Sequence, residues 1–243
     1  METISINGSC SCWRNEISRV KPGDFCYTEG EMKNINPELK KYIEDSIFPE
    51  YNKNEPGHGI QHINYVIDRS LKFAESLDVD INMVYAIAAY HDIGHHIDYK
   101  NHEKVSAEIL EKDQELRNFF TEEQIKTMAD AVYDHRSSMD GIPRTIYGKI
   151  VSQSDRDTNL EMPFKRTYAY RTEHHIGNSL EEIIEESRKH LLGKFGPNGT
   201  AREKVFFDDP ALEKFFTDIT NYANNKEEFR QEFLRVNNIK QEG

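Results

Sequence analysis

The sequence predicts an all-α protein. Apolar residues recur at spacings of three and four over most of the chain from residue 36 onward, which is the pattern of amphipathic helices. No run of alternating polar and apolar residues is long enough to build a central sheet. The chain has 243 residues, of which 37% are hydrophobic and 30% charged, so it has a globular composition and can bury a core without disulfides.

Residues 1–35 do not share the helical pattern. Pro22 and several glycines interrupt short apolar runs there, so we expect a small N-terminal appendage that is irregular or contains short strands. The cysteines of the chain, Cys10, Cys12 and Cys26, all lie in this appendage. Because the set is odd and sparse, it is no disulfide framework, and the sequence leaves the role of these cysteines open.

Six apolar stripes predict six helices between residues 36 and 159. In chain order, their residues are Leu39, Tyr42, Ile43 and Ile47; Ile63, Val66, Ile67, Leu71, Ala74 and Leu77; Val84, Ile87, Ala88 and His91; Val105, Ile109 and Leu110; Ile125, Met128, Ala129 and Val132; and Ile146, Ile150, Val151 and Ser154. Helix starts are indicated by Pro37 in a first turn, by Asp80 as an N-cap, and by Thr121 with Gln124 as a capping box.

The remainder of the chain continues as a helical extension. Over residues 160–243 we expect two or more helices, because the loops at 196–199 and 208–210 interrupt the pattern. The sequence shows no internal repeat and no low-complexity tract. We therefore expect one helical domain over residues 36–243, with its informative motifs confined to residues 57–159.

Net charge and hydropathy limit the choice of partners. A formal net charge of −12 repels phosphate backbones, which argues against long nucleic acid as a partner. A small phosphorylated ligand stays compatible, because a bound metal or a few cations can reverse the sign inside one pocket. No window approaches the ~18 apolar residues of a spanning helix. Residues 1–12 lack the basic start and apolar run of a signal peptide, so we expect a cytoplasmic protein with no membrane partner.

Histidines and aspartates recur on the faces of these helices that point to the core. His91 lies four residues after Ile87, and Asp155 lies four residues after Val151. The full set of such residues is His62, His91, Asp92, His102, His135 and Asp155. Burying two carboxylates is costly unless they meet cations, and a metal ion accepts both imidazole nitrogens and carboxylate oxygens. The pattern therefore predicts a metal centre.

Three segments around these residues resemble a known family. HGIQHINYV (58–66), AAYHDIGHH (88–96) and SQSDRDTN (152–159) are similar to the landmark segments of the HD superfamily of metal-dependent phosphohydrolases. The resemblance implies an HD-domain helical bundle. It also implies that one metal ion is bound by four of the residues above, His62, His91, Asp92 and Asp155.

Two further segments resemble a subset of that family. NHEKVSAEIL (101–110) and AVYDHRS (131–137) are similar to segments of dinuclear HD enzymes, including the bacterial HD-type dinucleoside polyphosphate hydrolases. This resemblance implies that His102 and His135 hold a second ion and that Asp92 bridges the pair. A carboxylate has two oxygens and can span ions about 3.5–4 Å apart. The sequence leaves open whether the chain holds one ion or two.

The chain departs from the family at one position. Many members have a lysine four residues after the first histidine of the doublet, whereas this chain has His95 followed by His96. A histidine there is a pH-dependent cation and a candidate general acid. Arg136 follows His135 and Arg156 follows Asp155, so adjacency makes both arginines candidates for contacting a phosphate. The catalytic residues that we predict are Asp92, His95, Arg136 and Arg156.

Histidine-rich ligation favours a divalent transition metal, such as manganese, iron, cobalt, nickel or zinc, over magnesium. Such an ion lowers the pKa of a bound water, and the hydroxide it supplies attacks phosphorus. We therefore predict a phosphohydrolase that acts on a nucleotide or another small phosphate ester or anhydride. Two alternatives stay open, an HD-type di-iron oxygenase of the myo-inositol oxygenase kind and a non-catalytic metal-bound ligand sensor. The sequence indicates neither the exact substrate nor the oligomeric state.

Overall fold

The computed structural model describes residues 35–240, with residues 175 and 176 left out. Within these residues the structure consists of helices and connecting loops, without a strand, which confirms the predicted all-α fold. The N-terminal appendage, with its three cysteines, lies outside the described residues except for Ile35. None of the described helices has the length and apolar character needed to cross a membrane.

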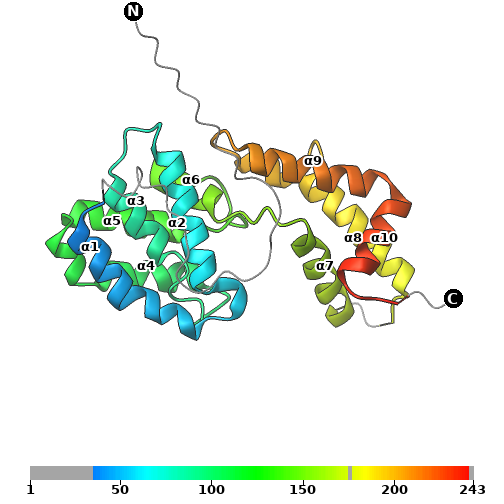
Figure 1. The fold of residues 1–243 in the computed structure, drawn as a ribbon, viewed down its shortest axis with the longest axis horizontal. Helices are drawn as coiled ribbons and strands as arrows, with labels where there is room; N and C mark the ends of the chain where they lie inside the picture. The colour runs from blue at the N-terminus through cyan, green and yellow to red at the C-terminus, as the bar shows by residue number, and fades with distance from the viewer. Residues whose placement is uncertain (1–34, 175–176, 241–243) are drawn as a thin grey trace, which may run out of the picture.

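The first group of helices surrounds the central helix α3 (Figure 1). Its members are α1 (Pro37–Tyr42), α2 (Ile60–Ala74), α3 (Ile81–Tyr90), α4 (His102–Lys112), α5 (Glu122–Tyr133) and α6 (Ile146–Ser154). Every residue of α3 from Met83 to Tyr90 is buried, because α2, α5 and α6 all pack against it. A helix that is apolar on all sides belongs in the centre of a bundle, and here the central helix ends at the His-Asp doublet.

The predicted start signals of α3 and α5 are confirmed. The side chain of Asp80 accepts a hydrogen bond from the backbone N–H of Asn82 at the start of α3. Thr121 and Gln124 form a reciprocal capping box at the start of α5. These caps satisfy backbone N–H groups that have no partner within the helix.

Two predicted helices differ in detail from the structure. The first is shorter than expected, since α1 passes into a π-helical turn (Ile43–Ile47) and a 3-10 helix (Phe48–Lys53). Pro49 lies in the 3-10 helix and lacks the N–H that an α-helix needs, so a regular α-helix cannot continue through it with its full set of hydrogen bonds. In α4 the fully buried face is formed by His102, Ser106, Ala107 and Leu110, while the predicted stripe residues Val105 and Ile109 are only half-buried.

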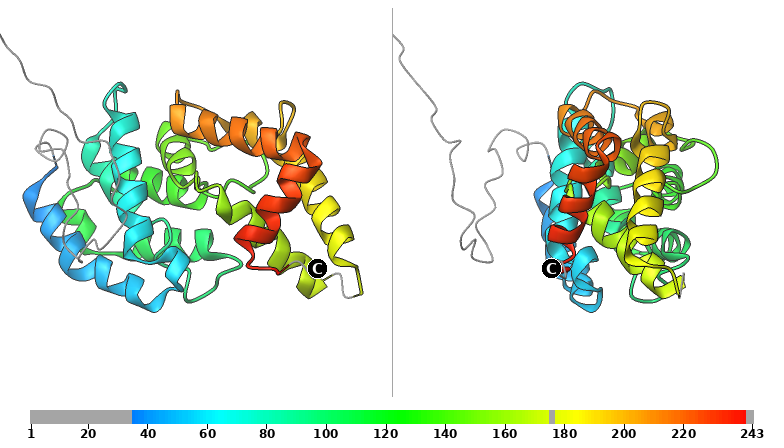
Figure 2. Two further views of the ribbon diagram at one scale, coloured as in Figure 1. Left: turned by 45° about the vertical axis from the view of Figure 1, so that its right-hand side comes forward. Right: turned by 90° about the vertical axis from the view of Figure 1, so that its right-hand side faces the viewer.

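The second group of helices has an apolar cluster of its own. It consists of α7 (Glu161–His174), α8 (Leu180–Phe195), α9 (Pro210–Asn224) and α10 (Lys226–Val236), so the described residues of this region contain four α-helices where two or more helices were expected. Buried aromatic rings, including Phe164, Phe216, Phe229 and Phe233, fill the cluster. The two groups occupy opposite sides of the molecule (Figures 1 and 2). A single domain over residues 36–243 stays a prediction.

Buried polar contacts join the two groups at α6. Gln153 of α6 accepts hydrogen bonds from the backbone N–H groups of Phe206 and Phe207 at 2.7 and 2.9 Å. Arg69 of α2 forms an ion pair of 2.5 Å with Asp209, the N-cap of α9, and both side chains are largely buried. The second group therefore anchors the helix that ends at Asp155.

Candidate metal centre

The structure brings together all six residues that the sequence predicts as metal ligands. They form two adjacent sets of three, each with its ligand atoms within 4.8 Å of one another. The first triad is His62, His91 and Asp155, and the second triad is Asp92, His102 and His135. Their assignment as ligands stays a prediction, but their convergence from five helices is a fact of the fold.

Helix ends place these side chains. His62 lies in the first turn of α2, just after the N-cap Gly59. His91 and Asp155 are the C-cap residues of α3 and α6. His102 is the first residue of α4. Because the buried stripes pack the helices against α3, the ends that carry these polar residues meet at one place in the bundle.

Gly94 allows α4 to approach the turn that follows the doublet. A Cβ at this position would lie 2.7 Å from Cγ1 of Val105 and 2.9 Å from the backbone nitrogen of Ser106, closer than real Cβ contacts allow. Only glycine fits such a close approach. The backbone N–H of Gly94 donates to Oγ of Ser106 at 2.9 Å, and this contact holds α4 with His102 beside Asp92.

Three of the histidines are oriented in the same way. Nδ1 of His91, His102 and His135 lies 2.8, 3.0 and 2.6 Å from the carbonyl oxygen of the residue three positions earlier. A carbonyl can only accept, so each ring donates its Nδ1–H and leaves the Nε2 lone pair free. The free nitrogens point into the cluster, where Nε2 of His91 lies 3.3 Å from Nε2 of His62 and Nε2 of His102 lies 3.2 Å from Nε2 of His135.

Asp92, a member of the second triad, also lies beside the first triad. Its Oδ1 is 3.2 Å from Nε2 of His102 and 3.4 Å from Nε2 of His135. Its Oδ2 is 3.6 Å from Nε2 of both His62 and His91. Oδ1 is buried and has no hydrogen-bond partner in the part of the chain that the structure describes. A buried carboxylate oxygen without a partner is costly, so this atom is available to a ligand.

The electrostatics of the cluster reflect a shortage of fixed cations. Among the described residues, Asp92 and Asp155 form their ion pairs with histidines alone. Burial alone would raise the pKa of both carboxyl groups. The surrounding histidines outweigh burial and hold the pKa of each below its usual range. Burial of His62 lowers its pKa, but hydrogen bonds to Asp155 and Asp92 outweigh this effect and raise the pKa to about 10.

One edge of the cluster is open to solvent. The side chains of Asp92, His91 and His135 are at most 2% exposed, whereas those of His62 and Asp155 are 18% and 24% exposed. A small molecule can therefore reach the first triad directly. The second triad is more deeply buried, since its side chains are at most 10% exposed.

His58 is a member of the cluster that the sequence did not identify. Its Nδ1 lies 2.7 Å from Oδ2 of Asp92, and its ring stacks on that of His95 with 4.0 Å between centroids. His58 belongs to a short 3-10 helix (Pro56–His58) that precedes α2, so no apolar stripe indicated that it points inward. Its position four residues before His62 is the one signal that the sequence offered.

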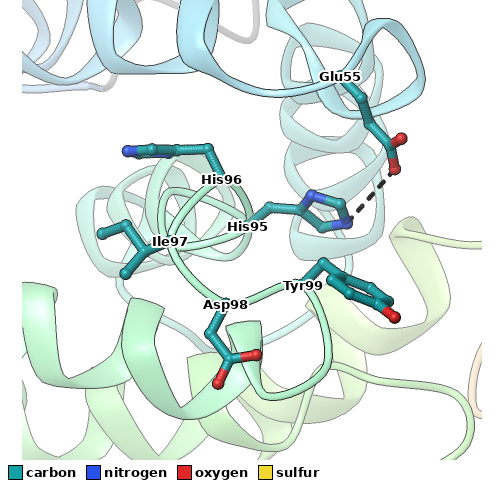
Figure 3. Close-up of a pocket in the computed structure, with 6 residues that line it drawn as sticks. All are labelled: Glu55, His95, His96, Ile97, Asp98 and Tyr99. Atoms are coloured by element: carbon teal, nitrogen blue, oxygen red, sulfur yellow. Dashed lines mark ion pairs between the residues drawn. The ribbon is translucent and has the colours of Figure 1, made fainter.

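The two histidines after the doublet point in different directions (Figure 3). His95 turns towards Glu55, with Nε2 3.9 Å from Oε1, whereas His96 points to the other side of the turn. His95 is only 7% exposed, and its ring makes no hydrogen bond within the described residues. Burial lowers the pKa of His95, and the neighbouring His58 lowers it further. Both histidines line an open pocket of about 510 Å³ beside the cluster.

The two arginines expected near a phosphate have other partners. Arg156 donates to the carbonyl oxygens of Ala201 and Lys204 at 2.8 and 2.7 Å, in the 3-10 helix Thr200–Lys204. Arg136 donates to the carbonyl of Lys100 at 2.8 Å and pairs with Glu103 at 3.1 Å. Adjacency in the sequence therefore did not indicate where these side chains point, and a catalytic role for either arginine stays a prediction.

Comparison with known proteins adds one finding. The family model of the HD domain matches residues 59–160, the region that contains both triads. Neither the curated proteins nor the solved structures gave a match. The matched residues nearly coincide with the motif region 57–159 expected from the sequence. Residues 59–160 therefore match the HD domain family.

Proposed function

We propose that the chain is a metal-dependent phosphohydrolase that acts on a nucleotide or another small phosphate ester or anhydride. The observation that carries the proposal is the orientation of His91, His102 and His135. Each gives its Nδ1–H to a backbone carbonyl and presents a free Nε2 lone pair beside Asp92. Backbone anchoring of this kind is typical of metal-binding histidines, because it fixes the tautomer and the ring orientation.

The donor set fits divalent transition metals. Imidazole nitrogens and carboxylate oxygens suit manganese, iron, cobalt, nickel and zinc, and the unpartnered Oδ1 of Asp92 offers a further ligand atom. His62, His91 and Asp155 would hold one ion, and His102 and His135 a second, with Asp92 contributing one oxygen to each. We therefore infer two ions per chain. Bound there, they would supply a water of lowered pKa and neutralise charge on a phosphoryl group.

We assign separate roles to Asp155, at the open edge of the cluster, and to His95, which is buried beside it. Asp155 is ionised at neutral pH, because the nearby histidines lower its pKa, so it can accept a hydrogen bond from a water that approaches the first triad. His95 is buried next to the cluster, and its ring forms no hydrogen bond in the described part of the chain beyond the ion pair with Glu55 at 3.9 Å, so it can donate to a substrate oxygen. Arg136 and Arg156 are engaged elsewhere and hold the surrounding loops.

Metal analysis combined with an activity screen tests this proposal. The full chain, purified without added metal, is expected to contain a transition metal and to release phosphate from at least one nucleotide or small phosphate ester with Mn²⁺, Co²⁺ or Zn²⁺. Asp92→Ala is expected to lose both metal and activity, because the removed carboxylate contacts both triads. His190→Ala, an exposed position on α8, is the matched control.

Several outcomes would contradict the proposal. Full hydrolysis by Asp92→Ala with its full metal content would reject the site. Iron together with substrate-dependent oxygen consumption, and no phosphate release, would favour the oxygenase alternative. Metal that is bound tightly without turnover of any kind would favour a ligand sensor.

A further inference from the structure

Residues 54–58, which we call the bracing segment, contact the turn that contains the His-Asp doublet. The side-chain N–H of Asn54 donates to the carbonyl oxygens of His58 and Asp92 at 2.9 and 3.1 Å. The Oδ1 of Asn54 accepts the backbone N–H of His96 at 3.0 Å. One half-buried side chain therefore ties His58, Asp92 and His96 to one another.

The ring of His58 is held from two sides. Nδ1 lies 2.7 Å from Oδ2 of Asp92, and an ionised carboxylate can only accept, so His58 donates its Nδ1–H. The ring of His95 stacks on the other side at 4.0 Å, with an angle of 16° between the planes. Stacking and hydrogen bonding together leave His58 little freedom to rotate.

The carboxylate of Asp92 needs such a partner. Rotation about the bond between Cβ and Cγ of an aspartate is soft, so the side chain does not set the orientation of its own two oxygens. In this structure Oδ1 has no hydrogen bond among the described residues and faces His102 and His135. The hydrogen bond from His58 to Oδ2 is therefore the contact that fixes which oxygen faces which triad.

We propose that His58, held in place by Asn54, is a positioning residue that orients the carboxylate of Asp92 so that each oxygen faces one triad. The inference rests on the proposed metal-dependent function, since it assigns His58 to the support of a metal ligand. Groups that orient metal ligands from behind typically change metal affinity 10–100-fold when they are removed. A direct ligand, in contrast, changes the number of ions bound.

Titration of the metal-free full chain with Mn²⁺ by calorimetry tests the proposal. We expect His58→Ala to bind the same number of ions as the wild type, with affinity reduced about 10–100-fold. His58→Asn should restore most of the loss, because its amide nitrogen occupies the position of Nδ1. His58→Gln should not, because its amide lies one carbon further out. Asn54→Ala should weaken binding in the same direction, and His190→Ala should leave it unchanged.

The variants separate a positioning role for His58 from direct ligation and from the absence of any role. Equal affinity in the wild type, His58→Ala and Asn54→Ala would overturn the proposal. Loss of an entire ion from both His58→Ala and His58→Asn would also overturn it, in favour of direct ligation by His58. If His58→Ala fails to fold, as judged by circular dichroism, the comparison of His58→Asn with His58→Gln decides. A wild-type chain that binds no metal would refute the proposed function itself, which is a distinct result.

Discussion

Substitution of the second triad distinguishes one bound ion from two. In His102→Ala, the second site would keep only His135 and Asp92 as donors, whereas the first site would keep His62, His91, Asp155 and the other oxygen of Asp92. Protein sites that bind zinc use at least three protein ligands. We therefore expect His102→Ala and His135→Ala each to lower the metal content from two ions per chain to one.

The size of the effect follows from the number of donors. Structural zinc sites with four ligands bind with about 10–16 kcal/mol at neutral pH, which is roughly 2.5–4 kcal/mol for each ligand. Loss of one ligand then weakens binding by a factor on the order of 10²–10³. His102→Ala is the cleaner variant, because the His102 side chain is 10% exposed whereas that of His135 is 1% exposed, so removal of the latter ring also leaves a cavity.

Elemental analysis after gel filtration in chelator-free buffer measures the ratio of metal to protein for the wild type and both variants at one pH. His190→Ala serves as the matched control, since it removes an exposed histidine outside the two triads. An unchanged metal count in both variants would refute the reasoning and leave a mononuclear site. A wild-type ratio of one would do the same.

Two further predictions concern the ion pair between the helix groups and the pH dependence of metal binding. Asp209→Ala should lower the free energy of unfolding by roughly 3–5 kcal/mol, because it leaves the largely buried guanidinium of Arg69 without its carboxylate. Urea unfolding measures this free energy, and a decrease of less than about 1 kcal/mol would contradict the prediction. Hydrogen bonds to carboxylates raise the pKa of His62 from 6.5 to about 10, so between these pH values the metal-free protein carries a proton that the metal must displace. Affinity for Mn²⁺ should therefore rise about tenfold per pH unit in calorimetric titrations between pH 7 and 9, and an affinity independent of pH would be inconsistent with that raised pKa.

The helices, and converging side chains such as those of His91 and Asp155, were predictable because both follow from periodicity. Positions such as Ile87 and His91 lie on one helix face, so the burial of the apolar residue also determines where the histidine points. The same holds for Val151 and Asp155 on α6. Since packing against α3 brings the helix ends together, a one-dimensional pattern was enough to indicate a three-dimensional cluster.

Residues outside regular helices were not predictable in this way. His58 and Asn54 lie in and beside short 3-10 segments, where no repeating pattern indicates an inward face. Arg156 follows the C-cap Asp155, and because the helix ends there, the direction of the next side chain is set by tertiary contacts. Those contacts lie more than 40 residues further along the chain, so adjacency to a ligand carried no information about them.

The position of Asp155 depends on both groups of helices. Gln153, two residues before it, accepts hydrogen bonds from the backbone N–H groups of Phe206 and Phe207. Arg156, one residue after it, donates to carbonyl oxygens of the 3-10 helix Thr200–Lys204. The family match ends at residue 160, yet these anchors lie at residues 201–207. Asp155 is the more exposed of the two carboxylates, with 24% of its side chain accessible, and these anchors hold it, whereas Asp92 is held by the hydrogen bond from His58 in the bracing segment. The two carboxylates of the centre are therefore supported by different parts of the chain.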